Sequence, residues 1–292
     1  MSTKDPQIKS YINLVRPKHW LKNILVFVPL LYAHNLTKPN LLFLTIQCFV
    51  SFCLISSVIY IINDIADVEK DRQHLVKCKR PIAAGQLSIK GAIAAAVILS
   101  VLGFFLSIFG FNSYLTFIFI ASYALLNFAY SFILKHQPLI DCFAIAAGFV
   151  LRIYAGAAAS ESPVSEWLFL TIVSVSLFMA FGKRRGEIIK VHDTNATRAV
   201  LSSYDVGFMN GIIFVCAGLS IVFYALWALS NHALMIYTVP LIIYIVCKYL
   251  MIIHDKQAHG DPIGTILGNR GLLLALLIFG ISSMMLLYMK GV

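Results

Sequence analysis

The segment from Asn63 to Arg72 has the residue types and the spacing that could do chemistry. If the apolar helix predicted just before it continues, Asp64, Asp67 and Asp71 recur at i, i+3 and i+7 and share one helix face. Like charges on one face repel each other unless a cation lies between them. Mg²⁺ prefers oxygen ligands and keeps positions for water and substrate phosphate. The spacing therefore predicts a magnesium site and catalytic roles for the three aspartates, with Asn63 as a helper.

A basic segment follows the aspartates directly. It contains Arg72, Lys77 and Arg80 and ends in the turn-forming run Pro81–Gly85. Arginine binds phosphate oxygens in a bidentate manner and lysine acts as a point charge. An acidic metal-binding face followed by these cations predicts a site for a Mg²⁺-bound diphosphate. A charged helix end at a membrane surface is the alternative explanation of the same residues.

Further candidate substrate-binding residues lie at the ends of the apolar runs or within one of them. An arginine inside an apolar run, such as Arg152, is costly and is a candidate functional residue, although an internal salt bridge would also explain it. The three consecutive cations after Gly182 could bind an anion or could only set membrane orientation. These candidates are Lys22, Asn23, Tyr130, Lys135, Arg152, Lys183, Arg184, Arg185 and Glu187.

The composition determines which elements must position these residues. The chain has 292 residues, of which 60% are hydrophobic and 12% are charged, and its mean hydropathy is +0.84. A soluble domain of this size needs more charge at its surface, so the chain is predicted to be an all-α, polytopic membrane protein with a single domain over 1–292. The predicted spans, nine in number, cover residues 22–34, 41–62, 89–110, 113–133, 138–159, 166–182, 207–229, 233–252 and 271–289.

The distribution of positive charge predicts the orientation. Of the 23 Lys and Arg residues, 20 fall on one side of the predicted spans, whereas only Lys38 and Lys290 fall on the other. Because cytoplasmic loops carry the excess of Lys and Arg, the N-terminus is predicted to be cytoplasmic. Residues 1–21 are predicted to form an interfacial segment, with Trp20 at the level of the headgroups.

The pattern Asn63-Asp64-x-x-Asp67-x-x-x-Asp71, followed by Arg80-Pro81-Ile82-Ala83-Ala84-Gly85, resembles the first signature of the UbiA superfamily of membrane prenyltransferases. Other stretches resemble the branch of that superfamily that transfers a phosphoribosyl group to decaprenyl phosphate. They are Arg16–Asn23, Tyr130–Lys135, Gly148–Arg152 and Gly182–Glu187.

The resemblance implies an enzyme with a nine-helix bundle and an active site under cytoplasmic loops, in a bacterial cytoplasmic membrane. Mg²⁺ is the implied cofactor. The implied partners are a polyprenyl phosphate lipid and a phosphorylated sugar donor; no nucleic acid is expected, and an oligomer is possible. The implied reaction moves a 5-phosphoribosyl group from phosphoribosyl diphosphate to the lipid phosphate.

The sequence departs from the family pattern at two places, and two other functions are considered. Members that prenylate aromatic rings usually carry a second Asp-rich motif where this chain has Lys183-Arg184-Arg185, which favours a second anionic substrate. The last predicted cytoplasmic loop has Asn269-Arg270 where the branch commonly has Asp-Arg. Polyprenyl transfer to an aromatic acceptor is the first alternative, and a membrane transporter is the second. A transporter is less favoured because transporter sites usually lie near the bilayer midplane.

Overall fold

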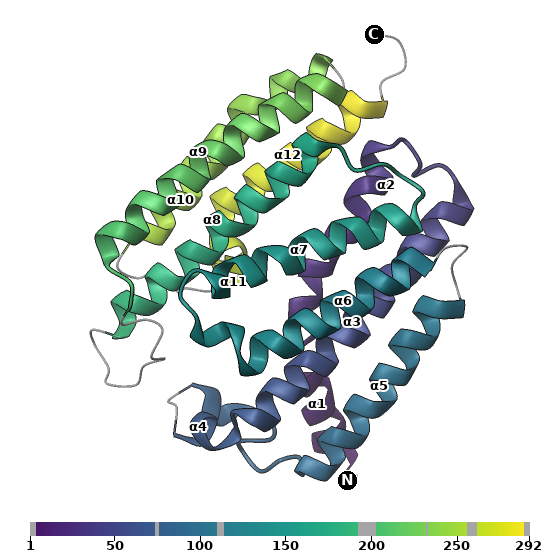
Figure 1. Ribbon diagram of the computed structural model, residues 1–292, viewed down its shortest axis with the longest axis vertical. Helices are drawn as coiled ribbons and strands as arrows, with labels where there is room; N and C mark the ends of the chain where they lie inside the picture. Colours follow the sequence, from purple (N-terminus) through teal and green to yellow (C-terminus); the bar gives the residue numbers. More distant parts are fainter. Residues whose placement is uncertain are drawn as a thin grey trace. The chain divides into compact units, whose positions relative to one another are not determined.

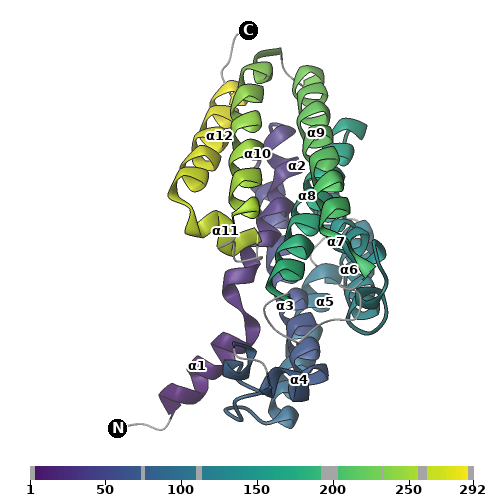
Figure 2. The ribbon, with the colours of Figure 1, turned by 90° about the vertical axis from the view of Figure 1, so that its left-hand side faces the viewer.

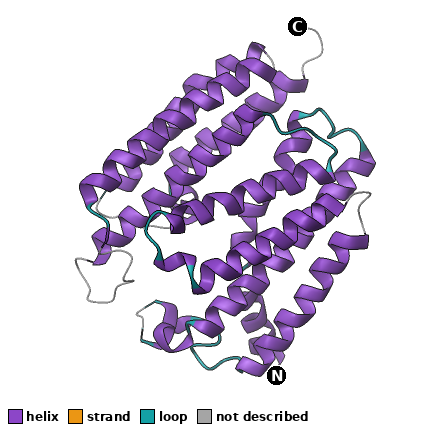
Figure 3. Ribbon diagram, viewed as in Figure 1, coloured by secondary structure: helices purple, strands orange, loops and turns teal. Residues whose placement is uncertain are grey.

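The computed structural model describes residues 4–73, 76–109, 114–191, 203–231, 233–255 and 262–288. In these ranges the regular secondary structure is entirely helical, without a strand (Figure 3). This confirms the all-α prediction. The physical reason is that a segment in lipid must satisfy its backbone N–H and C=O groups internally, which a helix does.

Figure 1 labels the helical elements in their order along the chain. They are α1 (Lys4–Val15), η1 (Pro17–Phe27), α2 (Val28–Tyr32), α3 (Pro39–Ala66), α4 (Val68–Arg72), η2 (Lys77–Lys79), α5 (Ile89–Phe109), α6 (Tyr114–Phe132), η3 (Leu134–His136), α7 (Ile140–Ala159), α8 (Glu166–Val191), α9 (Val206–Asn231), η5 (Ala233–Thr238), α10 (Val239–His254), α11 (Pro262–Gly268) and α12 (Arg270–Tyr288). The η elements are 3₁₀ helices.

Eight helical segments of the described ranges are long and apolar enough to cross a membrane. They correspond to the second through ninth predicted spans. The first predicted span, residues 22–34, does not form one regular helix: it contains the end of η1 and the short α2. Pro29 lies at the start of α2 and has no N–H to continue a hydrogen-bond ladder from η1.

The exposed side chains agree with a lipid environment. On α5, Ile93, Val97, Val101 and Phe105 recur every four residues and are each about half exposed. A soluble protein rarely leaves such a continuous apolar stripe uncovered. On this evidence, and on that of the apolar helices, the protein is an integral membrane protein.

The chain folds into two compact units. Unit 1 contains residues 1–131 and 151–162, and in it α3 packs along α5. One apolar core of this unit surrounds Phe52 and Ile55 of α3, and a second surrounds Ile61. Figure 2 shows the chain leading from α1, beside the N-terminus, through η1 to α2.

Unit 2 contains residues 132–150 and 163–292. Its α8 packs along α9 over their length, and its core includes Phe178 and Phe181 of α8, Ile213 of α9 and Tyr249 of α10. The division between the units falls within α7. The assignment of residues 1–292 to a single domain stays a prediction.

Candidate functional site

The aspartates of the acidic segment lie at a break between two helices. α3 ends at Ala66, and Asp67 has φ −98° and ψ 10°, after which α4 begins at Val68. The continuous helix on which the shared-face argument depended is therefore not formed. Hydrogen bonds of helical spacing still join Asp67 to Asn63 and Asp71 to Asp67, and Asp64 and Asp71 converge, because both bind the same arginine.

Arg80 joins the two carboxylates. Its Nη1 lies 3.0 Å from Oδ1 of Asp64 and 2.5 Å from Oδ2 of Asp71. The loop that carries Arg80 is anchored by Ile82, which is 2% exposed in the core around Ile61. The loop closes at Gly85, whose φ of +71° lies in the left-handed region that glycine adopts without steric cost.

Arg16 completes the cluster from the segment between α1 and η1. Its Nη2 donates to Oδ1 of Asp64, and its guanidinium lies 5.0 Å from the centre of the Tyr60 ring. Sequence reasoning did not place Arg16 in the site. The available signal was its position in the stretch Arg16–Asn23, which resembles the phosphoribosyl-transferring branch.

The cluster of Arg16, Asp64, Asp71 and Arg80, called the aspartate–arginine cluster below, has buried carboxylates, partly exposed guanidiniums and balanced charge. Asp64 and Asp71 are each 2% exposed, and each carboxylate has a guanidinium partner. One oxygen, Oδ2 of Asp64, is buried and has no hydrogen-bond partner in the described residues. A buried carboxylate oxygen without a partner is costly, so this oxygen fits a site for a cation that is bound from outside the chain.

The residues present therefore fit a divalent metal, but they are not a complete protein cage. In the described ranges no three His, Cys, Asp or Glu side chains gather closely enough to hold an ion. Asp67, the third predicted ligand, is half-buried and lies at the break itself. Mg²⁺ usually binds one or two carboxylates together with water and substrate phosphate, so two convergent aspartates satisfy what it requires.

Other predicted site residues of unit 1 lie near the acidic segment in sequence. Arg72 pairs with Glu69 at the surface, at 2.8 Å. Asn63 is half-buried, and its carbonyl accepts the N–H of Asp67. The half-buried members of the predicted set are Lys22, Lys77 and Tyr130.

Arg152 and Asn23 form a separate buried cluster in unit 1. Nε of Arg152 donates to Oδ1 of Asn23 at 2.8 Å, and Nη2 donates to the hydroxyl of Tyr123 at 2.8 Å. The guanidinium also lies 4.5 Å from the centre of the Tyr123 ring. These contacts attach η1 to α7. They favour the internal-interaction alternative for Arg152, and Tyr123 was not predicted from sequence.

The predicted cationic cluster of unit 2 is also engaged with protein groups. Arg184 is fully buried, and its Nε lies 2.5 Å from Oδ2 of Asp141 while its Nη1 lies 2.5 Å from Oε2 of Glu187. Arg185 donates to Oδ1 of Asn210 at 2.6 Å and to the Ile253 carbonyl at 2.7 Å.

Lys183 is the more exposed member of that cluster, and its Nζ lies 4.0 Å from Glu187. Lys135, another predicted contact of unit 2, is 9% exposed in η3. The structure thus brings Arg184 and Glu187 together, while Arg185 is directed to α9 and α10 instead.

Tyr204 extends the Arg184 network and was missed by sequence reasoning. Its hydroxyl donates to Oδ1 of Asp141 at 2.9 Å and accepts the N–H of Leu139 at 2.5 Å. Burial raises the pKa of Tyr204 above its usual value, and the adjacent Asp141 carboxylate raises it further. Asp141 stood out in the sequence as a carboxylate at the start of an apolar run, but nothing local indicated its partners.

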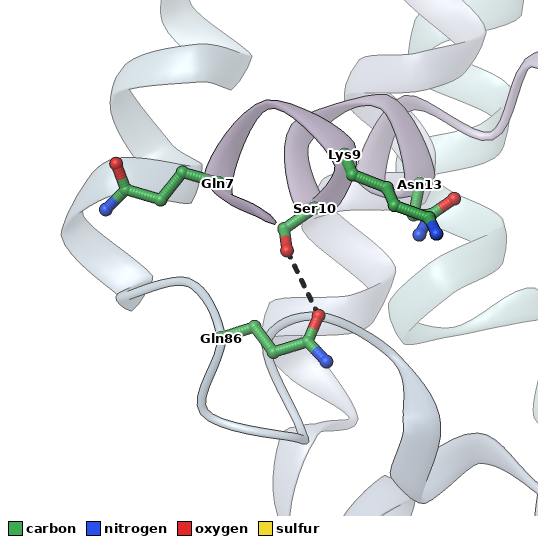
Figure 4. A pocket seen from close by; sticks show the side chains of 5 residues that line it. All are labelled: Gln7, Lys9, Ser10, Asn13 and Gln86. Carbon is green, nitrogen blue, oxygen red and sulfur yellow. Dashed lines mark hydrogen bonds between the residues drawn. The ribbon is translucent and has the colours of Figure 1, made fainter. Parts of the chain in front are cut away.

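A polar pocket of about 460 Å³ lies beside α1. Figure 4 shows its lining: Ser10 of α1 points toward Gln86 and donates to it at 3.1 Å, while Gln7 extends to one side of α1 and Lys9 and Asn13 extend to the other. The lining residues are Gln7, Lys9, Ser10, Asn13 and Gln86. None of them is a predicted site residue.

The protein is an all-α integral membrane protein. Its aspartate–arginine cluster lies at the end of α3, one of the membrane-spanning helices. The chain belongs to the UbiA prenyltransferase family, whose sequence profile matches residues 24–263, and it is a transferase of this type. This confirms the resemblance seen in the acidic segment.

Similar proteins are known by sequence and by structure. The decaprenyl-phosphate phosphoribosyltransferase of Corynebacterium glutamicum is 37% identical over 227 residues, which cover 76% of this chain and 68% of that protein. The protein of the same name from Mycolicibacterium smegmatis is 36% identical over 235 residues, covering 77% of this chain and 71% of that protein. A UbiA homologue from Archaeoglobus fulgidus, solved with GPP and Mg²⁺ bound, shares the fold with a TM-score of 0.73 at 20% identity, covering 95% of this chain and 96% of that one.

Proposed function

We propose that this protein transfers a 5-phosphoribosyl group from phosphoribosyl diphosphate to a polyprenyl phosphate in a Mg²⁺-dependent reaction. The observation that carries the proposal is the aspartate–arginine cluster, in which two carboxylates and two guanidiniums meet around an unpartnered oxygen of Asp64. The relatives at 36–37% identity, named for transfer of this group to decaprenyl phosphate, support the choice of substrates.

The carboxylates of Asp64 and Asp71 would hold the metal, with Asp67 as the further predicted ligand and Asn63 as a helper. When bound, Mg²⁺ would neutralise and polarise the leaving diphosphate. Arg80 already lies against both carboxylates, so its remaining N–H groups are placed to bind a phosphate next to the metal. Lys22, Arg72 and Lys77 stay predicted contacts of the same diphosphate.

The acceptor needs little help from a general base. A lipid phosphate is largely ionised at neutral pH, so its oxygen can attack C1 of the ribose without losing a proton to the protein. One C1–O bond, to the lipid phosphate, forms while the C1–O bond to diphosphate breaks, and diphosphate leaves with the bonding electrons. The polyprenyl chain would remain in the lipid phase. Transfer of a polyprenyl group to an aromatic ring would instead require a base for the ring proton.

The three cations Lys183, Arg184 and Arg185 have different roles in this proposal. Arg184 is neutralised by two carboxylates, and Arg185 is bonded to an amide and a carbonyl, so we assign both to holding the helices of that unit. Lys183 stays the predicted phosphate contact of this cluster. We further propose, from the charge distribution, that the protein lies in a bacterial cytoplasmic membrane with its N-terminus in the cytoplasm.

The decisive experiment compares donor and acceptor pairs. Purified protein is incubated with Mg²⁺ and either phosphoribosyl diphosphate plus polyprenyl phosphate or polyprenyl diphosphate plus 4-hydroxybenzoate, and the lipid products are identified by mass. We expect product from the first pair only. Product from the second pair alone would overturn the proposal in favour of ring prenylation.

Variants of the carboxylates test the site itself. Asp64→Asn and Asp71→Asn should each lower turnover by at least 100-fold, because one ligand and one negative charge are lost from a shared metal site. Glu166→Gln is the control, since Glu166 is an exposed carboxylate at the start of α8 that has no predicted role in the site. Wild-type turnover with an unchanged Mg²⁺ requirement in either Asp variant would contradict the metal role.

A further inference from the structure

The guanidinium of Arg16 donates a hydrogen bond to the carboxylate of Asp64. We propose that Arg16 fixes Asp64 so that Oδ2 faces the metal, and that its remaining N–H groups bind the diphosphate that accompanies the metal. Arg16 is then a substrate-binding residue that couples metal binding to diphosphate binding. This inference rests on the proposed function, because it assumes a metal-bound diphosphate at the aspartate–arginine cluster.

The two oxygens of Asp64 are used differently. Oδ1 accepts from both Nη2 of Arg16 and Nη1 of Arg80, whereas Oδ2 is buried without a partner in the described residues. The two arginines thereby hold the carboxylate plane from one side and leave the other oxygen for a cation. A metal can therefore bind Oδ2 without displacing either guanidinium.

The segment around Arg16 is held against α3, which places its side chain near Asp64. The hydroxyl of Ser57 lies 2.9 Å from the carbonyl of Val15 and 2.7 Å from that of Cys53, two acceptors that share its one proton, and it accepts from Nε1 of Trp20 at 3.0 Å. Residues on both sides of Arg16 therefore contact Ser57. Ser57, Tyr60 and Asp64 recur at i, i+3 and i+7 on one face of α3. On this face Ser57 contacts the backbone beside Arg16, the ring of Tyr60 lies against the guanidinium, and Asp64 accepts its hydrogen bond.

The conformation of Arg16 agrees with a functional role. Its φ of 53° lies in the left-handed region, which residues with a side chain rarely adopt. Such strain concentrates at sites where the surrounding structure imposes a required geometry. The following η1 is an 11-residue 3₁₀ helix, much longer than the usual few residues of this helix type.

Arg16 retains donors for a ligand. A guanidinium carries five N–H groups, and in the described residues the side-chain hydrogen bonding of Arg16 uses Nη2, toward Asp64. The Arg16 side chain is 19% exposed, so it can be reached from outside the protein. Planar, forked donors match phosphate oxygens, and this is why lysine does not replace arginine at such positions.

The charges explain why metal and diphosphate should bind together. The cluster already pairs two carboxylates with two guanidiniums, so a divalent cation alone would add positive charge beside Arg16 and Arg80. A diphosphate brought in with the metal removes this repulsion. Arg16 therefore disfavours the metal alone and favours the metal–diphosphate pair, which is a coupling between two ligands.

The test measures binding rather than turnover. Mn²⁺ binding to the purified full-length protein is titrated by electron paramagnetic resonance with and without inorganic pyrophosphate, for wild type, Arg16→Gln and Arg16→Lys. We expect Arg16→Gln to bind Mn²⁺ alone as tightly as wild type or more tightly, because Arg80 still holds Oδ1 of Asp64 and one neighbouring positive charge is gone. The variant should bind pyrophosphate at saturating Mn²⁺ at least 10-fold more weakly. Arg16→Lys should lose at least 3-fold in pyrophosphate affinity, because an ammonium lacks the planar fork of donors that binds a phosphate in a bidentate manner.

The control is Lys18→Gln, which removes one charge from an exposed side chain two residues away and should leave both affinities unchanged. Equal weakening of Mn²⁺ and pyrophosphate binding in the Arg16 variants would show a purely structural role and overturn the inference. Wild-type pyrophosphate affinity in both Arg16 variants would overturn it as well. Asp64→Asn separates the two proposals: if it leaves Mn²⁺ binding intact the proposed metal site fails, whereas if it abolishes binding the site stands whatever Arg16 does.

Discussion

Arg184 and Asp141 form an ion pair in which neither side chain is exposed, with Nε of Arg184 2.5 Å from Oδ2 of Asp141. Glu187 pairs with the same guanidinium, and Tyr204 donates to the second oxygen of Asp141. These contacts join the start of α7, the end of α8 and the residues before α9 within unit 2. A buried charge is tolerated only when it is paired and hydrogen-bonded, so the members of this network depend on one another.

Removal of one partner should therefore destabilise the fold. We expect Asp141→Asn and Arg184→Lys to lower the free energy of unfolding, by roughly 3–5 kcal/mol where a buried charge is left uncompensated. Thermal unfolding of the purified protein in detergent measures this, with Glu166→Gln, an exposed carboxylate at the start of α8, as the control. Unchanged stability together with a raised KM for the phosphorylated sugar in Arg184→Lys would instead support the phosphate-binding role predicted from sequence.

Tyr204 gives this network a dependence on pH. Because the pKa of Tyr204 is raised in the folded protein, the folded state keeps the phenol proton at pH values where the unfolded chain has lost it. The contribution is complete below the ordinary tyrosine pKa of about 10 and is lost as pH rises above that value. Tyr204→Phe should be less stable than wild type at pH 8, by about 1.5–3 kcal/mol for a lost hydrogen bond to a charged group.

The difference between wild type and Tyr204→Phe should then narrow above pH 10, since the variant has no phenol to ionise. Unfolding temperatures of both proteins between pH 8 and pH 11 measure it. A difference that stays constant over this range would contradict a raised pKa at Tyr204.

Gly156 permits a close approach between η1 and α7. A Cβ at this position would lie 2.0 Å from the carbonyl oxygen of Val26, which is backbone and cannot rotate away. Gly156→Ala should therefore force η1 from α7 and lower stability by roughly 1–3 kcal/mol, the usual range for overpacking. Gly211→Ala on α9 is the control, because a Cβ there meets nothing within 4 Å. Equal unfolding temperatures for the two variants would show that η1 is not held closely at Gly156.

The hydroxyl of Tyr123 is expected to stabilise Arg152. Tyr123→Phe keeps the ring and removes only the acceptor of the 2.8 Å bond from the guanidinium. The free energy of unfolding should fall by roughly 1.5–3 kcal/mol, the range for a hydrogen bond to a charged group. Tyr114→Phe is a suitable control because Tyr114 is 79% exposed. A loss of the same size in both variants would argue against a specific role for Tyr123.

Membrane orientation can be tested with single exposed cysteines. Lys38→Cys and Lys79→Cys place a thiol at exposed positions on the two predicted sides of the membrane. The background should lack Cys78 and Cys247, since the other four native cysteines are buried. In intact cells a membrane-impermeant maleimide should label residue 38 and not residue 79. Labelling of both positions, or the reverse pattern, would refute the predicted topology.

The sequence by itself determined the class of structure and the place of the acidic segment. Runs of about 20 apolar residues can cross a bilayer only as helices, because no water is present to satisfy the backbone, so eight of the nine predicted spans could be located from hydropathy. The residues Asn63–Asp71 and Arg80–Gly85 indicated the family for a similar reason: closely spaced carboxylates and a tight turn are local features that one-dimensional spacing records.

Which charges neutralise one another depends on how the chain packs in three dimensions. Arg16 and Asp64 are 48 residues apart, and Arg184 and Asp141 are 43 residues apart, so no local spacing could relate them. The spacing also predicted a continuous helix through Asp71. In the structure the helix is interrupted at Asp67, and the carboxylates of Asp64 and Asp71 both pair with Arg80. The physical reason is that helix periodicity depends on neighbours within a few residues, while the free energy of a buried charge depends on whichever partner the packing brings within hydrogen-bonding distance.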